Sequence, residues 1–97
     1  MREKRDIMQN YTITVIRKTG VNAFTEEETV GTFDAEMLGP AKRTASEYIQ
    51  NWLIDRKITV RTRGDWERDA RRAGTSREIM VTENGAMVKM IFILRET

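Results

Sequence analysis

The stretch "REIMVTENGAMVKMIFIL", residues 77–94, decides the fold. Asn84-Gly85 stands between two segments in which apolar and polar residues alternate. This dipeptide is the preferred centre of a two-residue type I′ turn, because both central residues need positive φ. A two-residue loop also sets the register of the hairpin, so Val81 is expected opposite Val88. The other expected pairs are Glu83 with Ala86, Ile79 with Met90, and Arg77 with Phe92.

The hairpin predicts two unequal faces. The first is apolar and carries Ile79, Val81, Val88, Met90, Phe92 and Leu94. A sheet backed by one helix needs only one such face, yet the second face is half apolar and rich in methionine, which suits adaptable contact surfaces. Two explanations stay open: a neighbouring loop or arm covers this face, or it binds a second copy of the chain or another partner. The residues predicted for this second interface are Met80, Met87, Lys89 and Ile91.

A single amphipathic helix is expected in the middle of the chain. Proline suits the first helical position, where its missing N–H costs nothing, so Gly39-Pro40 marks the start. From there apolar residues recur with helical spacing as far as about Asp55. The stripe consists of Ala41, Ala45, Tyr48, Ile49, Trp52 and Leu53.

Three further segments, residues 11–18, 29–33 and 57–63, are rich in β-branched residues and predict strands. We therefore predict an α+β fold in the order β-β-α-β-β-β, with an antiparallel sheet of four to five strands packed against one helix. We expect residues 10–97 to form a single domain and residues 1–9 to form a flexible charged arm. The expected core is Ile13, Val15, Phe33, Ala45, Ile49, Trp52, Leu53, Val60, Ile79, Val81, Val88, Met90 and Phe92.

The composition excludes several kinds of chemistry. The 97 residues include no cysteine and no histidine, which removes disulfides, thiolate chemistry and every nucleophile that needs an imidazole base. The glutamate triplet at residues 26–28 is expected to be a solvated loop, because consecutive carboxylates do not converge on one metal ion. We predict no catalytic residue, no metal and no cofactor. The chain shows no signal peptide and no membrane span, so an intracellular, cytoplasmic location is expected.

The segment "RTRGDWERDARRAGTSR", residues 61–77, concentrates positive charge in a chain whose net charge is only +2. Asp65 as an N-cap and Gly74 as a C′ residue predict a short helix at 66–73. Its arginines are either solvated decoration of that helix or one recognition lobe for carboxylates or phosphates. The predicted partner-binding residues are Arg61, Arg63, Trp66, Arg68, Arg71, Arg72 and Arg77.

The charge pattern favours a protein partner over nucleic acid. Acidic residues lie among the arginines, only Trp66 is placed to stack on a base, and no nucleic-acid-binding motif is present. The leading hypothesis is therefore a non-catalytic binding protein. The alternative is a small nucleic-acid-binding accessory protein that uses the arginine-rich lobe at residues 61–77.

The stretch "FDAEMLGPAKRTASEYI", residues 33–49, resembles a strand-to-helix passage of a small type I-F anti-CRISPR protein from phages and mobile elements. The matching residues are Ala35, Glu36, Leu38, Ala41, Lys42, Arg43, Ala45 and Ser46. The resemblance implies a phage inhibitor without catalytic activity that docks on a CRISPR-Cas effector subunit and blocks its action. The chain departs from that family member in its greater length, its arginine-rich insertion, and its lack of cysteine and histidine.

Overall fold

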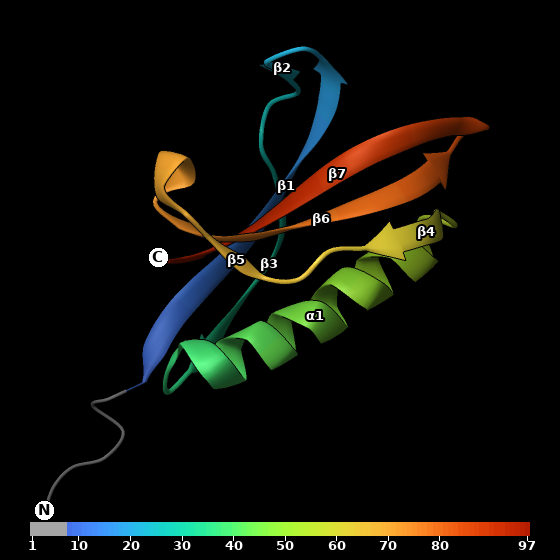
Figure 1. Cartoon of the computed structure of the whole chain (residues 1–97). Coiled ribbons are helices and arrows are strands. Elements are labelled where there is room, and N and C mark those ends of the chain that lie inside the picture. The colour runs from blue at the N-terminus through green and yellow to red at the C-terminus, as the bar shows by residue number, and fades with distance from the viewer. Residues whose placement is uncertain (1–7) are drawn as a thin grey trace, which may run out of the picture.

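One helix packs against one face of an antiparallel sheet in the computed structural model, which describes residues 8–97 (Figure 1). The elements in chain order are β1 (Gln9–Gly20), β2 (Ala23–Phe24), β3 (Glu28–Ala35), α1 (Leu38–Asp55), β4 (Thr59–Arg63), β5 (Glu67–Asp69), the 3₁₀ turn η2 (Ala70–Arg72), β6 (Gly74–Glu83) and β7 (Ala86–Glu96). The predicted α+β class, the antiparallel sheet and the broad element order are confirmed. The sheet has seven strands because the short β2 and β5 join the predicted ones.

The sheet is built around β1, β7 and β6. β1 pairs with β7 on one side, and β3 and β2 share its other side. β6 pairs with β7, and its outer edge is divided between β4 and β5. Successive side chains of a strand point to opposite faces, so the sheet has an inner face against α1 and an outer face away from it. Most of the predicted arm lies outside the described residues, and Gln9 begins β1.

The hairpin of β6 and β7 has the predicted register. Val81 lies opposite Val88, and the other three expected pairs also form. Asn84 and Gly85 have φ angles of 53° and 81°, as a type I′ turn requires.

Helix α1 begins at Leu38, two residues earlier than predicted, so Pro40 is its third residue rather than its first. The N-cap is Met37, which provides no side-chain hydrogen bond. Both positions lie in the first turn, where a backbone N–H has no helical partner, so proline is tolerated at either. The buried stripe is Ala41, Ala45, Ile49, Trp52 and Leu53.

The core lies between α1 and the inner face. Phe92 is fully buried, and its ring meets that of Trp52 edge-on at 5.8 Å between centroids. Tyr48, predicted in the apolar stripe, lies at the rim of the core and contacts Phe33 with ring centroids 5.4 Å apart. The predicted core residues are buried, except that Phe33, Val60 and Val88 are partly buried around its edge.

A smaller cluster of Ile16, Ile91 and Ile93 lies on the outer face and is also buried. The guanidinium of Arg72 lies 5.2 Å from the ring centroid of Phe24, and both residues line a small pocket together with Ile91. The chain around β2 and the turn η2 therefore meet over this part of the sheet. Of the two explanations for the mixed face, coverage by neighbouring segments holds for these isoleucines.

The helix predicted at residues 66–73 is wrong. Residues 67–69 form β5, which pairs with residues 74–76 of β6, and only residues 70–72 make a single 3₁₀ turn. The N-cap is Asp69 rather than Asp65, because its carboxylate accepts a hydrogen bond from the backbone N–H of Arg72. Ala73 ends the turn with a φ of 53°. The free edge of β6 thus recruits the segment as a strand, and tertiary pairing overrides a local helical pattern that is too short to be stable alone.

Candidate binding surface

The structure separates the predicted arginine-rich lobe into three groups. Trp66, Arg72 and Arg77 make internal contacts, Arg61 and Arg71 lie on the outer face, and Arg63 and Arg68 point to the inner side, where α1 lies. The seven residues therefore do not form one surface. Strand alternation causes this division, because the segment is largely extended where a helix was predicted.

Trp66 and Arg77 attach the chain between β4 and β5 to the helix. The indole Nε1 of Trp66 donates to Ser46 Oγ at 3.1 Å, and Arg77 Nη1 donates to the same oxygen at 3.2 Å. Arg77 also donates to the carbonyl of Gly64, and its guanidinium lies 5.5 Å from the Trp66 ring centroid. Burial, assisted by the nearby charge of Arg63, lowers the pKa of Arg77. Both predicted contact residues are therefore engaged within the protein.

Arg72 stabilises the turn η2. Its guanidinium forms an ion pair with Asp69 at 2.9 Å, and its carbonyl accepts a hydrogen bond from Arg95. Asp69 also accepts a hydrogen bond from Ser76. The charge of Arg72 is therefore largely satisfied by its neighbours.

Arg61 and Arg71 reach the outer face by different local geometries. The register between β4 and β6 shifts between Val60 and Thr62, so Arg61 is the extra residue of a bulge. Its Nε donates to Thr82 Oγ1 at 2.9 Å, which turns the side chain toward the outer face. Arg71 is exposed in the middle of η2 and lines the small pocket with Lys89.

The second predicted interface lies on this same outer face. Met80 pairs with Lys89 across β6 and β7, and Met87 is 61% exposed. Ile91, by contrast, is 5% exposed, so it contributes little contact area. We define the outer basic face by its exposed or half-exposed residues: Lys18, Phe24, Arg61, Arg71, Met80, Met87 and Lys89. Parts of two separately predicted interfaces thus form one surface.

Much of the charge on this side of the sheet is paired, and one carboxylate of the same face, Glu67 opposite Ser76, has no cation within 4.0 Å among residues 8–97. Lys89 forms an ion pair with Glu78, and Arg95 binds Glu27 through two hydrogen bonds. Lys18, Arg61 and Arg71 have no carboxylate within 4.0 Å among residues 8–97. These cations are available to a partner.

Sequence reasoning missed Lys18 and Phe24 as members of the face. Lys18 could have been found, because it follows Thr14 and Ile16 at the two-residue period of a strand. Phe24 carries no such signal, since its position depends on the irregular pairing of β2 with the end of β1.

The glutamates at residues 26–28 are exposed, as expected, and two of the three are also tied into the fold. Glu27 accepts a hydrogen bond from Thr14 as well as from Arg95, and Glu28 pairs with Arg17 and Arg56. No three acidic side chains gather as a metal site would require anywhere in residues 8–97. The cationic partners of Glu27 and Glu28 explain why these carboxylates diverge.

Comparison with protein-family models, curated proteins and solved structures finds no match to this chain. The only helix of the described part, α1, is not long and apolar enough to cross a membrane.

Proposed function

We propose that the protein is a non-catalytic binding protein whose outer basic face docks on an acidic partner surface. The observation that carries the proposal is the combination of unpaired Lys18, Arg61 and Arg71 with exposed methionine on one side of the sheet. Arginine forms paired hydrogen bonds with carboxylates, and methionine adapts to varied apolar contacts, so both residue types are enriched at interfaces.

The titratable groups support a binding role over a catalytic one. Hydrogen bonds from Arg95 lower the pKa of Glu27, and hydrogen bonds from Arg17 lower the pKa of Glu83. A general acid or base near neutral pH needs the opposite shift in a carboxyl group. With neither histidine nor cysteine in the chain, these carboxylates are better suited to structural ion pairs than to proton transfer.

The narrower proposal is an anti-CRISPR inhibitor of phage origin that docks on a CRISPR-Cas effector complex in the host cytoplasm. It rests on the resemblance of residues 33–49. Several matching residues serve the fold here, since Ala41 and Ala45 are buried against the sheet and Ser46 binds Trp66. The residues of the outer basic face lie outside residues 33–49, so this face supports a docking function independently of the resemblance.

The experiment is a titration of a purified type I-F surveillance complex with the protein, with binding of target DNA by the complex as the readout. We expect the protein to abolish DNA binding at a stoichiometric ratio to the complex. The Arg61→Ala/Arg71→Ala variant should need a concentration at least about tenfold higher to reach the same inhibition. The matched control is Arg43→Ala/Arg63→Ala, which removes two exposed arginines away from the outer basic face. Equal inhibition by the Arg61→Ala/Arg71→Ala variant and the wild-type protein would contradict the proposed surface.

The second candidate is a nucleic-acid-binding accessory protein. It is favoured by the half-exposed Phe24 ring, which lines a small pocket with Lys18 and Arg71, since single-stranded bases stack on aromatic rings within positively charged grooves. A gel shift with single-stranded DNA at increasing salt separates the two candidates. An affinity for single-stranded DNA that falls steeply with salt, together with loss of DNA binding in the Arg61→Ala/Arg71→Ala variant, would favour the nucleic-acid candidate. This conclusion also requires that the protein leaves DNA binding by the surveillance complex unchanged.

A further inference from the structure

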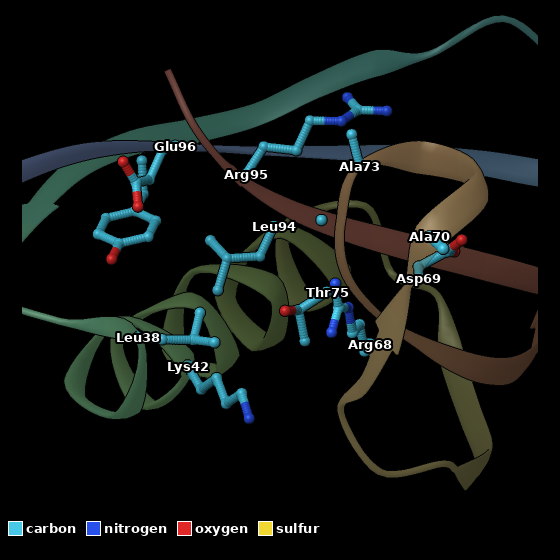
Figure 2. A pocket seen from close by; sticks show the side chains of 12 residues that line it. Leu38, Lys42, Arg68, Asp69, Ala70, Ala73, Thr75, Leu94, Arg95 and Glu96 are labelled. Carbon is cyan, nitrogen blue, oxygen red and sulfur yellow. The ribbon is translucent and has the colours of Figure 1, made fainter.

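A cavity of about 750 Å³ lies on the inner side of the sheet, away from the outer basic face. It forms where β6 begins at Gly74 and the preceding chain turns aside into η2, so that the last residues of β7 have only β1 as a neighbour. The first turns of α1 close the other side (Figure 2). The proposed binding function does not use this cavity.

The floor of the cavity is apolar. Leu94 is 1% exposed, and Tyr11 is also buried beside it. Leu38, in the first turn of α1, points toward Leu94 across the space (Figure 2). An apolar group placed between these side chains would remove exposed surface of Leu38 from water.

Two cations line the cavity beside this floor, one on each side. Lys42 lies one helical turn after Leu38, and Arg68 comes from β5 on the opposite side of the cavity. Within residues 8–97, neither has a carboxylate partner closer than 4.0 Å. An anion held between them would gain from both charges.

Thr75 adds a hydrogen-bonding group on the side of the cavity where Arg68 lies. It is the direct cross-strand neighbour of Arg68, lies next to it in Figure 2, and is only 7% exposed. No hydrogen bond to its hydroxyl is found among residues 8–97. The hydroxyl is not a fully buried polar atom, so it is open to the cavity and can bond to a ligand oxygen there.

The carboxylates around the cavity do not cancel these cations. Asp69 is engaged by Arg72 and Ser76. Glu96 lies apart from the two cations in Figure 2 and pairs with Tyr11 across β1 and β7. Burial raises the pKa of Tyr11, and the charge of Glu96 adds a smaller increase. One end of the cavity is therefore cationic, with an apolar floor beside it.

We propose that this cavity binds a small organic anion, a carboxylate or phosphate monoester attached to an apolar body. The anionic group lies between Lys42 and Arg68 and accepts a hydrogen bond from Thr75. The apolar body packs against Leu38 and Leu94. Both parts of the ligand are needed, because the polar side chains bind only the anionic group and the leucines bind only the apolar body.

The test is a calorimetric titration of the full chain with benzoate, phenyl phosphate, inorganic phosphate and benzyl alcohol. One of the two aromatic anions should saturate a single site, and inorganic phosphate and benzyl alcohol should bind at least about tenfold more weakly. The tighter of the two aromatic anions tells whether the site prefers carboxylate or phosphate. Failure of both to saturate would overturn the proposal.

Matched variants locate the site. Lys42→Gln and Arg68→Gln should each weaken binding of the preferred anion by at least about fivefold, and Thr75→Val by a smaller factor. Arg43→Gln and Arg63→Gln are exposed controls that do not line the cavity and should leave binding unchanged. Urea unfolding of each variant verifies that the fold is retained. Equal loss of binding in controls and cavity variants would show non-specific attraction and contradict the site.

Discussion

Trp66 Nε1 donates a hydrogen bond of 3.1 Å to Ser46 Oγ, which joins the chain before β5 to the middle of α1. Ser46 also accepts from Arg77 and donates to the carbonyl of Lys42. A hydroxyl has one donor and two acceptor sites, so all of its capacity is used. This single side chain therefore connects the helix to the part of the segment at residues 61–77 that is not available to a partner.

Replacing Ser46 with alanine should lower the free energy of unfolding by about 1–3 kcal/mol, because Trp66 and Arg77 each lose an acceptor in a half-buried place. The measurement is urea unfolding followed by circular dichroism. Gln50→Ala, at an exposed position one turn further along α1, is the control and should change stability by at most about 0.5 kcal/mol. Similar losses in both variants would show that the shared hydroxyl adds no stability.

Gly31→Ala should destabilise the protein by about 1–3 kcal/mol. A Cβ at this position of β3 would lie 2.6 Å from Cδ2 of the Tyr48 ring, so the ring that packs on Phe33 must move. Gly20→Ala is the matched control, since its Cβ would meet only the Ala23 side chain at an ordinary 3.7 Å. Thermal unfolding of the two variants measures the difference, and equal melting temperatures would contradict the close packing.

Asp69→Ala should cost about 2 kcal/mol or more, since Arg72 loses its ion pair and Ser76 and the backbone of η2 lose hydrogen bonds. Asp65→Ala removes the carboxylate that a helix at residues 66–73 would use as its cap. That residue is exposed and outside β5, so its change should be close to neutral. Denaturant unfolding compares the two variants. A larger loss in Asp65→Ala would restore the helical interpretation.

Stability should decrease in acid partly through Glu83. Hydrogen bonds from Arg17, at 2.8 Å each, lower the pKa of this carboxyl group below its ordinary value of 4.5. The ionised carboxylate therefore stabilises the fold fully at pH values above the ordinary pKa. This stabilisation is lost as the pH falls through the lowered pKa of the folded protein.

The measurement is urea unfolding from about pH 7 to about pH 3, in which Glu83→Gln should lose less stability on acidification than the wild-type protein. Glu47→Gln, on the exposed side of α1, is the control. It should reproduce the wild-type slope. An unchanged slope in Glu83→Gln would mean that the pair with Arg17 adds no pH-dependent stability.

The elements with strong local signals could be predicted from the sequence. Asn84-Gly85 and the alternation around it determine the hairpin and its register, and the apolar spacing determines the buried stripe of α1. β5 could not be predicted, because its conformation depends on the free edge of β6 rather than on local preference.

The candidate surface could be predicted only in part, for the same reason. A helix at residues 66–73 would gather its arginines on one element, whereas a strand followed by a turn sends them to opposite faces. The internal roles of Trp66 and Arg77 depend on Ser46, which is far away in the sequence. The methionine-bearing face was visible from alternation in β6 and β7, but its union with Arg61 depends on a bulge in β4.

The most direct test of the binding function is an NMR titration of isotope-labelled protein with a glutamate-rich peptide, which maps contacts residue by residue. We expect amide shifts to change around Lys18, Arg61, Arg71 and Lys89, and to be lost in the Arg61→Ala/Arg71→Ala variant. Shifts confined to α1, or no shifts at all, would contradict the assignment of the outer basic face as the docking surface.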